Sequence, residues 1–307
     1  MSGDQIRFGV YSGPQHATFD GCLELWQRCE ELGYDWLSVF DHFMPIVGDA
    51  GGPCFEGPTM LAALAAHTSK VRVAILVTGV TYRHPAVAAN IAATIDHISG
   101  GRAEYGVGAA WMEDEHRQYG IPFPRLGVRF DMLDEACRVM RGLWTEPRFS
   151  FEGEHYQLQN AQMEPKPVQA RLPLIIGGEG EKRTLRIVAE HADVWNSGLH
   201  EVETFRHKLD VLGRHCEAVG RDPATIRKSL TFRAVLATDE ASLKERRREV
   251  VLPLEDEKFS FLTTEQAVER MRPFAELGGN DFLLAAYAPY DWESLELFVR
   301  EVAPQLR

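Results

Sequence analysis

The stretch Val71-Arg72-Val73-Ala74-Ile75-Leu76-Val77-Thr78 decides the fold that the sequence predicts. Apolar side chains stand at both odd and even positions of this run, so both faces of the predicted strand are apolar. A strand of this kind is typical of a parallel sheet that helices cover on its faces. A helical pattern at Ala86–Ile98 and a further strand at Ala103–Ala110 follow it, as a β-α-β unit requires.

The same alternation of strand and helix extends in both directions along the chain. Strands are predicted at Ile6–Ser12, Trp36–Asp41, Val71–Thr78, Ala103–Ala110, Leu174–Gly178, Asp193–Asn196, Ile226–Ala237 and Asp281–Ala286. The helices that follow them are predicted at Thr18–Leu32, Thr59–His67, Ala86–Ile98, Arg125–Trp144, Lys182–His191, Glu201–Val219, Thr264–Leu277 and Trp292–Val302. Strict alternation favours a parallel sheet, and eight such units in a chain of 307 residues favour a closed (β/α)8 TIM barrel. An open, doubly wound sheet is the alternative.

One connection is too long for an ordinary loop. The segment Phe149–Pro173 predicts an insertion at about residues 148–173, after the fourth unit. Its first part, Phe149–Leu158, has the pattern of a hairpin around Glu152-Gly153. No linker divides the chain, so we expect one domain over residues 1–307.

The composition is that of a globular protein and argues against several classes. Lys and Arg number 33 against 45 Asp and Glu, a net charge of −12, which disfavours general binding to nucleic acid or anionic membranes. The five cysteines form no Cys-x-x-Cys pair, so neither a disulfide framework nor a structural zinc site is expected. No stretch approaches the roughly 18 apolar residues of a membrane span, and residues 1–9 show no signal-peptide pattern. A cytoplasmic protein is therefore expected.

The strand ends select the candidate catalytic residues, because active sites of (β/α)8 barrels lie at the C-terminal ends of the strands. Asp41 and His42 close the second predicted strand. A histidine accepts or donates a proton near neutral pH, and an adjacent acid can fix its tautomer. The alternative is a histidine that only completes a buried hydrogen-bond network. No metal-ligand spacing is present, so no metal site is expected.

Glycines and other small residues end further strands. Gly177 and Gly178 follow the fifth strand, where backbone N–H groups can approach an anion and the next helix adds a favourable dipole. A flexible turn explains these two glycines equally well. The small residues at neighbouring strand ends leave room for a flat ring system: Gly79, Gly108, Ala109 and Ala110. Trp111 and Trp195 are expected either to stack on such a ring or to close the top of the barrel.

Together these residues resemble a known family. The matching motifs in chain order are Glu31 to Trp36, Asp41-His42-Phe43, Thr78-Gly79-Val80-Thr81-Tyr82-Arg83-His84-Pro85, Ala93 to Arg102, Gly106 to Trp111, Gly120 to Pro124, Phe151 to Tyr156, Pro165 to Val168 and Ile176-Gly177-Gly178. They are similar to the bacterial luciferase-like superfamily and, more narrowly, to its branch of F420-dependent oxidoreductases. The resemblance covers most of the chain, from about Ile6 to Asn196.

The resemblance implies a TIM barrel with a flavin or deazaflavin at its C-terminal mouth. It assigns proton transfer beside the ring to His42, and contact with the coenzyme or orientation of the site to Asp41. It also implies a non-prolyl cis peptide near Thr78-Gly79-Val80. The implied cofactor-binding set is Asp41, His42, Thr78, Gly79, Val80, Gly108, Ala109, Ala110, Trp111, Gly177, Gly178 and Trp195. Because the coenzyme is anionic and the chain is acidic, we expect Lys182, Arg183 and backbone N–H groups to bind it.

These implications lead to three hypotheses for the function. The first is an F420-dependent oxidoreductase that transfers a hydride between the deazaflavin and a small organic substrate. The resemblance also implies that this protein is a homodimer. The second is an FMN-dependent monooxygenase that works with a flavin reductase. The third is a carrier or sensor that binds the cofactor without catalysis. The sequence does not identify the substrate, whose specificity is expected to come from the loops Met44–Pro58, Arg148–Pro173 and Val250–Phe261.

Overall fold

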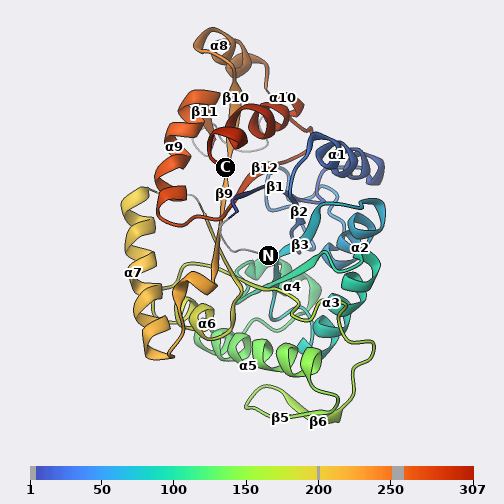
Figure 1. Cartoon of the computed structure of the whole chain (residues 1–307). Coiled ribbons are helices and arrows are strands. Elements are labelled where there is room, and N and C mark those ends of the chain that lie inside the picture. The colour runs from blue at the N-terminus through green and yellow to red at the C-terminus, as the bar shows by residue number, and fades with distance from the viewer. Residues whose placement is uncertain (1–4, 199–200, 251–258) are drawn as a thin grey trace.

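The computed structural model describes residues 5–198, 201–250 and 259–307, and a closed barrel of eight parallel strands forms its centre (Figure 1). The barrel strands are β1 (Arg7–Ser12), β2 (Trp36–Val39), β3 (Arg72–Gly79), β4 (Ala103–Gly108), β7 (Leu174–Gly177), β8 (Val194–Gly198), β9 (Arg227–Phe232) and β12 (Asp281–Ala286). Each pairs with the next along the chain, and β12 closes the ring against β1. The predicted (β/α)8 TIM barrel is confirmed, and the open sheet is excluded.

Helices surround the strands (Figure 1). The α-helices are α1 (Phe19–Leu32), α2 (Gly57–His67), α3 (Pro85–Ser99), α4 (Glu113–Tyr119), α5 (Leu126–Thr145), α6 (Thr184–His191), α7 (Val202–Ala218), α8 (Glu240–Glu249), α9 (Thr264–Glu276) and α10 (Trp292–Leu297). Shorter helical turns are η1 (Pro223–Thr225), η3 (Phe298–Val302) and η4 (Ala303–Gln305). Several ends are capped as their sequences predict: Thr18 accepts the Gly21 amide at the start of α1, and Gly33 ends it with φ +90°. No helix in the described part of the chain is both long and apolar enough to cross a membrane.

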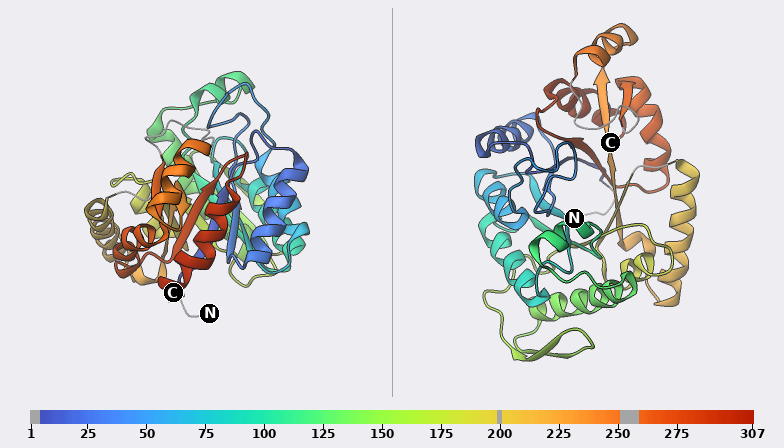
Figure 2. Two further views of the ribbon diagram at one scale, coloured as in Figure 1. Left: turned by 90° about the horizontal axis from the view of Figure 1, so that it is seen from above. Right: turned by 180° about the vertical axis from the view of Figure 1, so that it is seen from behind.

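The predicted insertion after the fourth unit is an antiparallel hairpin. Its strands are β5 (Phe149–Glu152) and β6 (Gln157–Ala161), which lie beside α5 (Figures 1 and 2). In Figure 1, α8 is at the opposite edge of the molecule.

The predicted seventh strand, Ile226–Ala237, is wrong as a single element. It divides at Arg233 into β9, which belongs to the barrel, and β10 (Ala234–Ala237), which does not. β10 lies outside the barrel and pairs in parallel with β11 (Ser260–Thr263). The sequence pattern did not predict β11. Most of the predicted specificity loop Val250–Phe261 lies outside the described residues, as do the first four residues of the N-terminal segment.

The barrel interior is filled from its N-terminal end upward. Arg7 of β1 contacts Asp281 of β12 (Nε to Oδ1, 2.7 Å) and Glu104 of β4 (Nη1 to Oε1, 2.6 Å). A small cluster of buried apolar residues, drawn from strands alone, fills the middle: Trp36, Ala74, Leu76, Ile175, Val194 and Leu283. The C-terminal end of the barrel is the part that remains open for a site.

Candidate active site

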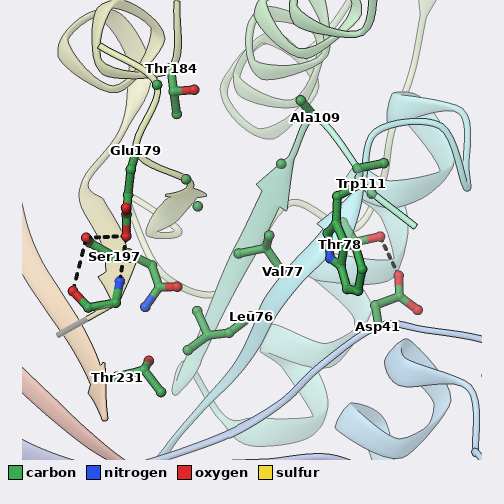
Figure 3. Close-up of a pocket in the computed structure, with 18 of the residues that line it drawn as sticks. Asp41, Leu76, Val77, Thr78, Ala109, Trp111, Glu179, Thr184, Ser197 and Thr231 are labelled. Carbon is green, nitrogen blue, oxygen red and sulfur yellow. Dashed lines mark hydrogen bonds between the residues drawn. The ribbon is translucent and has the colours of Figure 1, made fainter. Parts of the chain in front are cut away.

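A cavity of about 550 Å³ lies at the C-terminal ends of the barrel strands (Figure 3). Its wall holds most of the residues that the sequence selected: Asp41, His42, Thr78, Gly79, Gly108, Ala109, Ala110, Trp111, Gly177 and Gly178. These residues come from β2, β3, β4 and β7 and from the loops after them. The rule that placed them at strand ends therefore brought them together around one space.

Two of the predicted cofactor contacts, Val80 and Trp195, are not on the cavity wall. Val80 is buried in the core, and its amide donates to the Gly108 carbonyl at 2.9 Å. Trp195 is fully buried, stacks on Phe205 and donates from Nε1 to the Gly178 carbonyl at 2.8 Å. Trp195 lies in β8, where the alternation of strand residues points its side chain away from the barrel axis, and Val80 directly follows β3. Both side chains support the cavity wall from the outer side.

The third barrel strand is irregular where it borders the cavity. The peptide between Leu76 and Val77 is cis, and the pairing of β3 with β4 shifts register between Ile75 and Thr78. The predicted non-prolyl cis peptide near Thr78-Gly79-Val80 is confirmed and lies directly before Thr78. It falls inside the register break, and the residues after it resume pairing with β4. Leu76 and Val77 stand in the middle of the cavity floor (Figure 3).

His42 is held by a carboxylate that the sequence analysis did not select. Its Nδ1 lies 2.9 Å from Oε1 of Glu115, a fully buried residue of α4. Glu115 also accepts the Phe43 amide at 2.8 Å and the Tyr82 hydroxyl. Since Nδ1 faces Glu115 and no described residue bonds Nε2, Nε2 is the nitrogen that His42 presents to the cavity. The Trp111 ring flanks the imidazole, with 5.3 Å between ring centroids.

The electrostatics of this pair favour an ionised Glu115. Burial alone raises the pKa of Glu115, but hydrogen bonds from His42 and Tyr82 hold it below its ordinary value. Burial and the bond to Glu115 raise the pKa of Tyr82, so its hydroxyl stays a donor. A carboxylate beside Nδ1 fixes the imidazole ring and its tautomer, as a proton-transfer histidine needs.

Asp41, the neighbour of His42, has a different set of partners. Its buried carboxylate accepts from the Thr78 hydroxyl and from the guanidinium of Arg83, which also contacts Glu56. Burial lowers the pKa of Arg83, but the contacts with Asp41 raise it above its ordinary value. The charge of Asp41 is thus balanced by Arg83. Its geometry suits orientation of the ends of β2 and β3 rather than proton transfer.

The glycine-rich turn after β7 forms the opposite wall of the cavity. Gly178 has φ +117°, a backbone conformation that L side chains rarely adopt. The Glu179 carboxylate accepts from the Ser197 hydroxyl at 2.8 Å and the Gly198 amide at 2.9 Å, and it points away from Thr184 at the start of α6 (Figure 3). Within the described chain, the backbone amides of residues 180–183 donate to no group. They are available to an anion at the N-terminal end of α6.

The cationic side chains expected to support this turn are placed elsewhere. Neither Lys182 nor Arg183 is on the cavity wall, and Arg183 pairs with Asp131 of α5. This geometry does not support the expectation that the side chains of Lys182 and Arg183 bind the coenzyme. The turn offers its backbone N–H groups as donors instead.

A comparison of the sequence with known families identifies the family to which this site belongs. Residues 4–301 match the sequence profile of the luciferase-like monooxygenases. The chain belongs to the luciferase-like monooxygenase family. This confirms the resemblance that the strand-end motifs indicated.

Within the luciferase-like monooxygenase family, the chain is similar to enzymes of two kinds. An F420-dependent glucose-6-phosphate dehydrogenase of Intrasporangium calvum is 29% identical over 91% of this chain and 92% of its own length. The pyrimidine monooxygenase RutA of Acinetobacter baylyi is 32% identical over 70% of this chain and 59% of its own length. An uncharacterized protein of Mycobacterium tuberculosis is 33% identical over 58% of this chain. The match spans 64% of that relative's length.

Solved structures of the luciferase-like fold do not separate the two kinds. An F420-dependent secondary alcohol dehydrogenase, in complex with an F420-acetone adduct, superposes with a TM-score of 0.84 at 22% identity, over 99% of both chains. The long-chain alkane monooxygenase LadA superposes with a TM-score of 0.83 at 16% identity, over all of this chain and 92% of its own. At these identities the likeness establishes the fold alone.

Several residues of the site were missed by the sequence analysis. Glu115 stands on α4, a short helix that the hydrophobic pattern did not predict, 73 positions from its partner His42. No local spacing connects two residues so far apart. Tyr82 and Arg83 belong to a motif that carried the family resemblance, so their position after the third strand could have marked them. Thr231 and Arg233 are on the wall at the end of β9, where the strand was predicted to continue.

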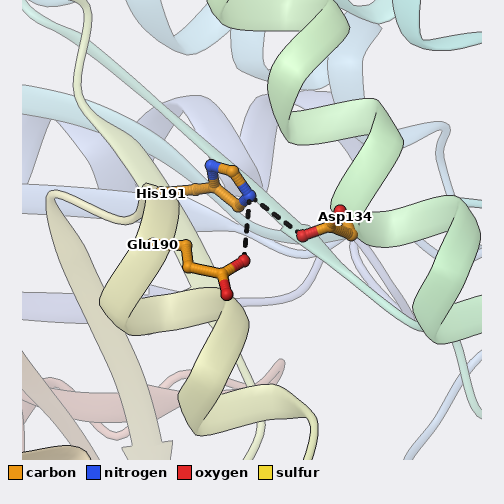
Figure 4. Close-up of side chains that lie close together, drawn as sticks. All are labelled: Asp134, Glu190 and His191. Atoms are coloured by element: carbon orange, nitrogen blue, oxygen red, sulfur yellow. Dashed lines mark hydrogen bonds and ion pairs between the residues drawn. The ribbon is translucent and has the colours of Figure 1, made fainter. Parts of the chain in front are cut away.

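Outside the cavity, Asp134, Glu190 and His191 lie close together (Figure 4). Nε2 of His191 is 3.0 Å from Asp134 Oδ1 and 3.6 Å from Glu190 Oε2, and Glu190 also pairs with Arg186 at 3.1 Å. A hydrogen bond from His191 lowers the pKa of Asp134. These contacts already satisfy the three side chains and tie α5 to α6.

Proposed function

We propose that the chain is an F420-dependent oxidoreductase that transfers a hydride between the deazaflavin and a small organic substrate. The observation that carries the proposal is the His42–Glu115 pair, which opens onto the cavity at the mouth of the barrel. The similarity to an F420-dependent dehydrogenase over 91% of the chain supports the same cofactor. A homodimer and a cytoplasmic location stay predictions from the sequence, as does the single domain.

The residues of the cavity fit a coenzyme of this kind. Its volume of about 550 Å³ is within the ordinary range of cofactor pockets. A Cβ atom at Gly108 or Gly177 would come within 3.0 Å of Val77 on the cavity floor. Glycine at both positions therefore keeps the wall between β4 and β7 flat enough for a planar ring.

The chain offers different groups to the parts of F420. The free amides of residues 180–183 would hold a phosphate, with the dipole of α6 behind them. Ala109, Ala110 and Trp111 would flank the ring system. When bound, F420 supplies the hydride chemistry.

His42 would handle the proton that accompanies the hydride. Its Nε2 is directed to the cavity, while Glu115 holds Nδ1 and stabilises the imidazolium that forms when the ring takes up a proton. Asp41, Arg83 and Thr78 keep the ends of β2 and β3 together behind it. A residue in this position contributes to turnover more than to coenzyme affinity.

A second candidate function is favoured by the similarity to RutA. RutA is named as a pyrimidine monooxygenase. In this alternative the chain is an FMN-dependent monooxygenase that receives reduced flavin from a reductase. The same wall of glycines would hold FMN. Incorporation of oxygen from O₂ into an added substrate, in the presence of chemically reduced FMN, separates this candidate from the first.

The experiment that tests the proposal replaces His42 with alanine. We expect oxidation of reduced F420 by a panel of aldehydes and ketones to fall by roughly 100-fold or more, with coenzyme affinity within about threefold of wild type. His207→Ala on the surface of α7 is the matched control and should behave as wild type. Unchanged turnover in His42→Ala would remove the proposed role of this residue, and incorporation of oxygen from O₂ into a substrate with reduced FMN would favour the monooxygenase.

A further inference from the structure

Arg233 is a cation on the cavity wall whose charge is unbalanced within the described chain. Its Nε lies 3.2 Å from the Tyr287 hydroxyl, and no described carboxylate pairs with its guanidinium. Arg83, which lies behind the cavity wall, contacts both Asp41 and Glu56. In a chain with 45 acidic and 33 Lys and Arg side chains, an arginine without an acidic partner is available for an anion.

Two hydroxyl groups accompany Arg233. Thr231 precedes it by two positions at the end of β9, so both side chains lie on the cavity side of the strand. Tyr11 comes from β1, which is separated from β9 by β12 alone. No hydrogen bond joins the hydroxyl of Tyr11 or Thr231 to any described residue, although both side chains are on the cavity wall. Burial raises the pKa of Tyr11, so its hydroxyl is a donor at neutral pH.

The three donors come from β1 and from the end of β9, whereas the glycine-rich turn follows β7. Figure 3 shows Thr231 on the side of the cavity away from Asp41 and Trp111, and below Ser197 and the Glu179 carboxylate. The acids nearest the cavity are engaged: Asp41 by Arg83, and Glu179 by Ser197 and Gly198. An anionic group of a ligand beside Arg233 would therefore contact hydrogen-bond donors. It would not face an unpaired carboxylate among the described residues of the cavity wall.

We propose that Arg233, Tyr11 and Thr231 form a subsite for a carboxylate or phosphate group of the substrate. This inference rests on the proposed function, because it assigns the glycine-rich side of the cavity to the coenzyme and the Arg233 side to the substrate. The two free Nη groups of a guanidinium match the paired oxygens of either anion. The substrate class is then a small organic molecule that carries an anionic group, rather than a neutral alcohol or ketone.

The test measures anion binding by isothermal titration calorimetry at low ionic strength, with inorganic phosphate and acetate as probes. Wild type, Arg233→Gln and Arg233→Lys are compared in the presence and absence of saturating F420. Arg206→Gln, an exposed arginine of α7, is the control. We expect Arg233→Gln to weaken anion binding by at least about tenfold while F420 affinity stays within about twofold. Arg233→Lys keeps the charge without the planar fork and should lose less.

The outcomes separate the subsite from the proposed function. Equal anion binding by wild type and Arg233→Gln would overturn the subsite, and so would a parallel loss of F420 affinity, which would assign Arg233 to the coenzyme. If wild type fails to bind F420, the proposed function fails, whereas the titrations without F420 still decide whether Arg233 binds anions. The stronger of the two probes indicates whether the natural group is a phosphate or a carboxylate.

Discussion

Glu115 shows how one buried residue organises the site. Its carboxylate accepts hydrogen bonds from the His42 ring, the Phe43 amide and the Tyr82 hydroxyl. An ionised group in such a position is stable only when donors replace the water that it loses on burial. Because these donors lower its folded-state pKa, Glu115 releases its proton below the range of an ordinary glutamate and keeps its charge from pH 5 to 8. If turnover depends on pH between 5 and 8, the titration of a group other than Glu115 is therefore the cause.

We predict that Glu115→Gln lowers turnover with little effect on coenzyme binding. The amide has one acceptor oxygen and an NH₂ group that opposes one of the three donors, so the orientation of His42 is lost. The expected loss in kcat is on the order of 10- to 100-fold, as for other residues that orient a functional histidine. Steady-state kinetics and an F420 titration provide the two readouts. Glu113→Gln on the same helix is the control, and a fully active Glu115→Gln would show that the contact is only structural.

The sequence predicts part of this site, for a physical reason. The residues Asp41, Gly79, Gly108 and Gly177 were found because barrel geometry gathers strand ends, whatever their distance in sequence. Glu115 was not found because its role depends on the path of α4 over the barrel mouth, which no periodicity encodes. Arg233 was missed because its strand was expected to continue past it.

At the scale of elements, prediction was best where a helix or strand packs on the barrel. The helices from α1 to α3 and the strands from β1 to β4 bury long apolar faces, and their patterns are strong. The elements α4 and β11 escaped prediction and are short, and β10 was not separated from β9. Their positions depend on tertiary packing more than on local sequence.

Helix α5 supports a prediction of its own, because Gly142 is packed against a ring. A Cβ atom at Gly142 would lie 2.2 Å from the Phe149 side chain, whereas one at Gly213 of α7 would meet nothing within 4 Å. Alanine in an open helical position stabilises by roughly 0.5–1 kcal/mol relative to glycine. We therefore expect Gly213→Ala to raise the free energy of unfolding by that amount. Gly142→Ala should lower it by about 1–3 kcal/mol through overpacking.

Urea denaturation of the two variants checks this prediction. Gly213→Ala controls for helix propensity, since the same substitution is made in both helices. Stabilisation by Gly142→Ala would mean that the hairpin yields to the extra methyl group and does not pack tightly on α5.

At the scale of the whole molecule, an ionic cluster closes the barrel at its N-terminal end. Asp281 is fully buried and accepts from Arg7 at 2.7 Å and from Arg227 at 2.6 Å, which joins β12 to both of its neighbours. Burial alone raises the pKa of Asp281, but these two arginines hold it below its ordinary value. The contribution to stability is therefore complete above the unfolded-state pKa, near 4, and is lost as the pH falls through the lower folded-state value.

We predict that Asp281→Asn lowers the free energy of unfolding by roughly 3 kcal/mol or more at pH 7, because it removes the charge of a buried carboxylate that Arg7 and Arg227 share. The difference from wild type should stay constant between pH 5 and 8 and narrow below about pH 4, where the native carboxylate also loses its charge. Urea unfolding at a series of pH values measures this difference in the free energy of unfolding. The control is Asp210→Asn, on the exposed face of α7, which should unfold as wild type does. A difference between Asp281→Asn and wild type that grows as the pH falls would contradict the predicted role of Asp281.

The sequence profile establishes the family, whereas the fold does not distinguish between the cofactors of its members. The barrel superposes equally well on an F420-dependent dehydrogenase and on a monooxygenase, with TM-scores of 0.84 and 0.83. The cofactor therefore has to be identified through the cavity, whose wall includes His42, Gly108 and Gly177 and whose glycine-rich turn carries the free amides of residues 180–183.

The most direct measurement is a fluorescence titration of the purified protein with F420 and, separately, with FMN. The account predicts tight binding of F420 and weak binding of FMN, both in wild type and in His42→Ala. Tight binding of FMN with weak binding of F420 would contradict it and assign the cavity to a flavin.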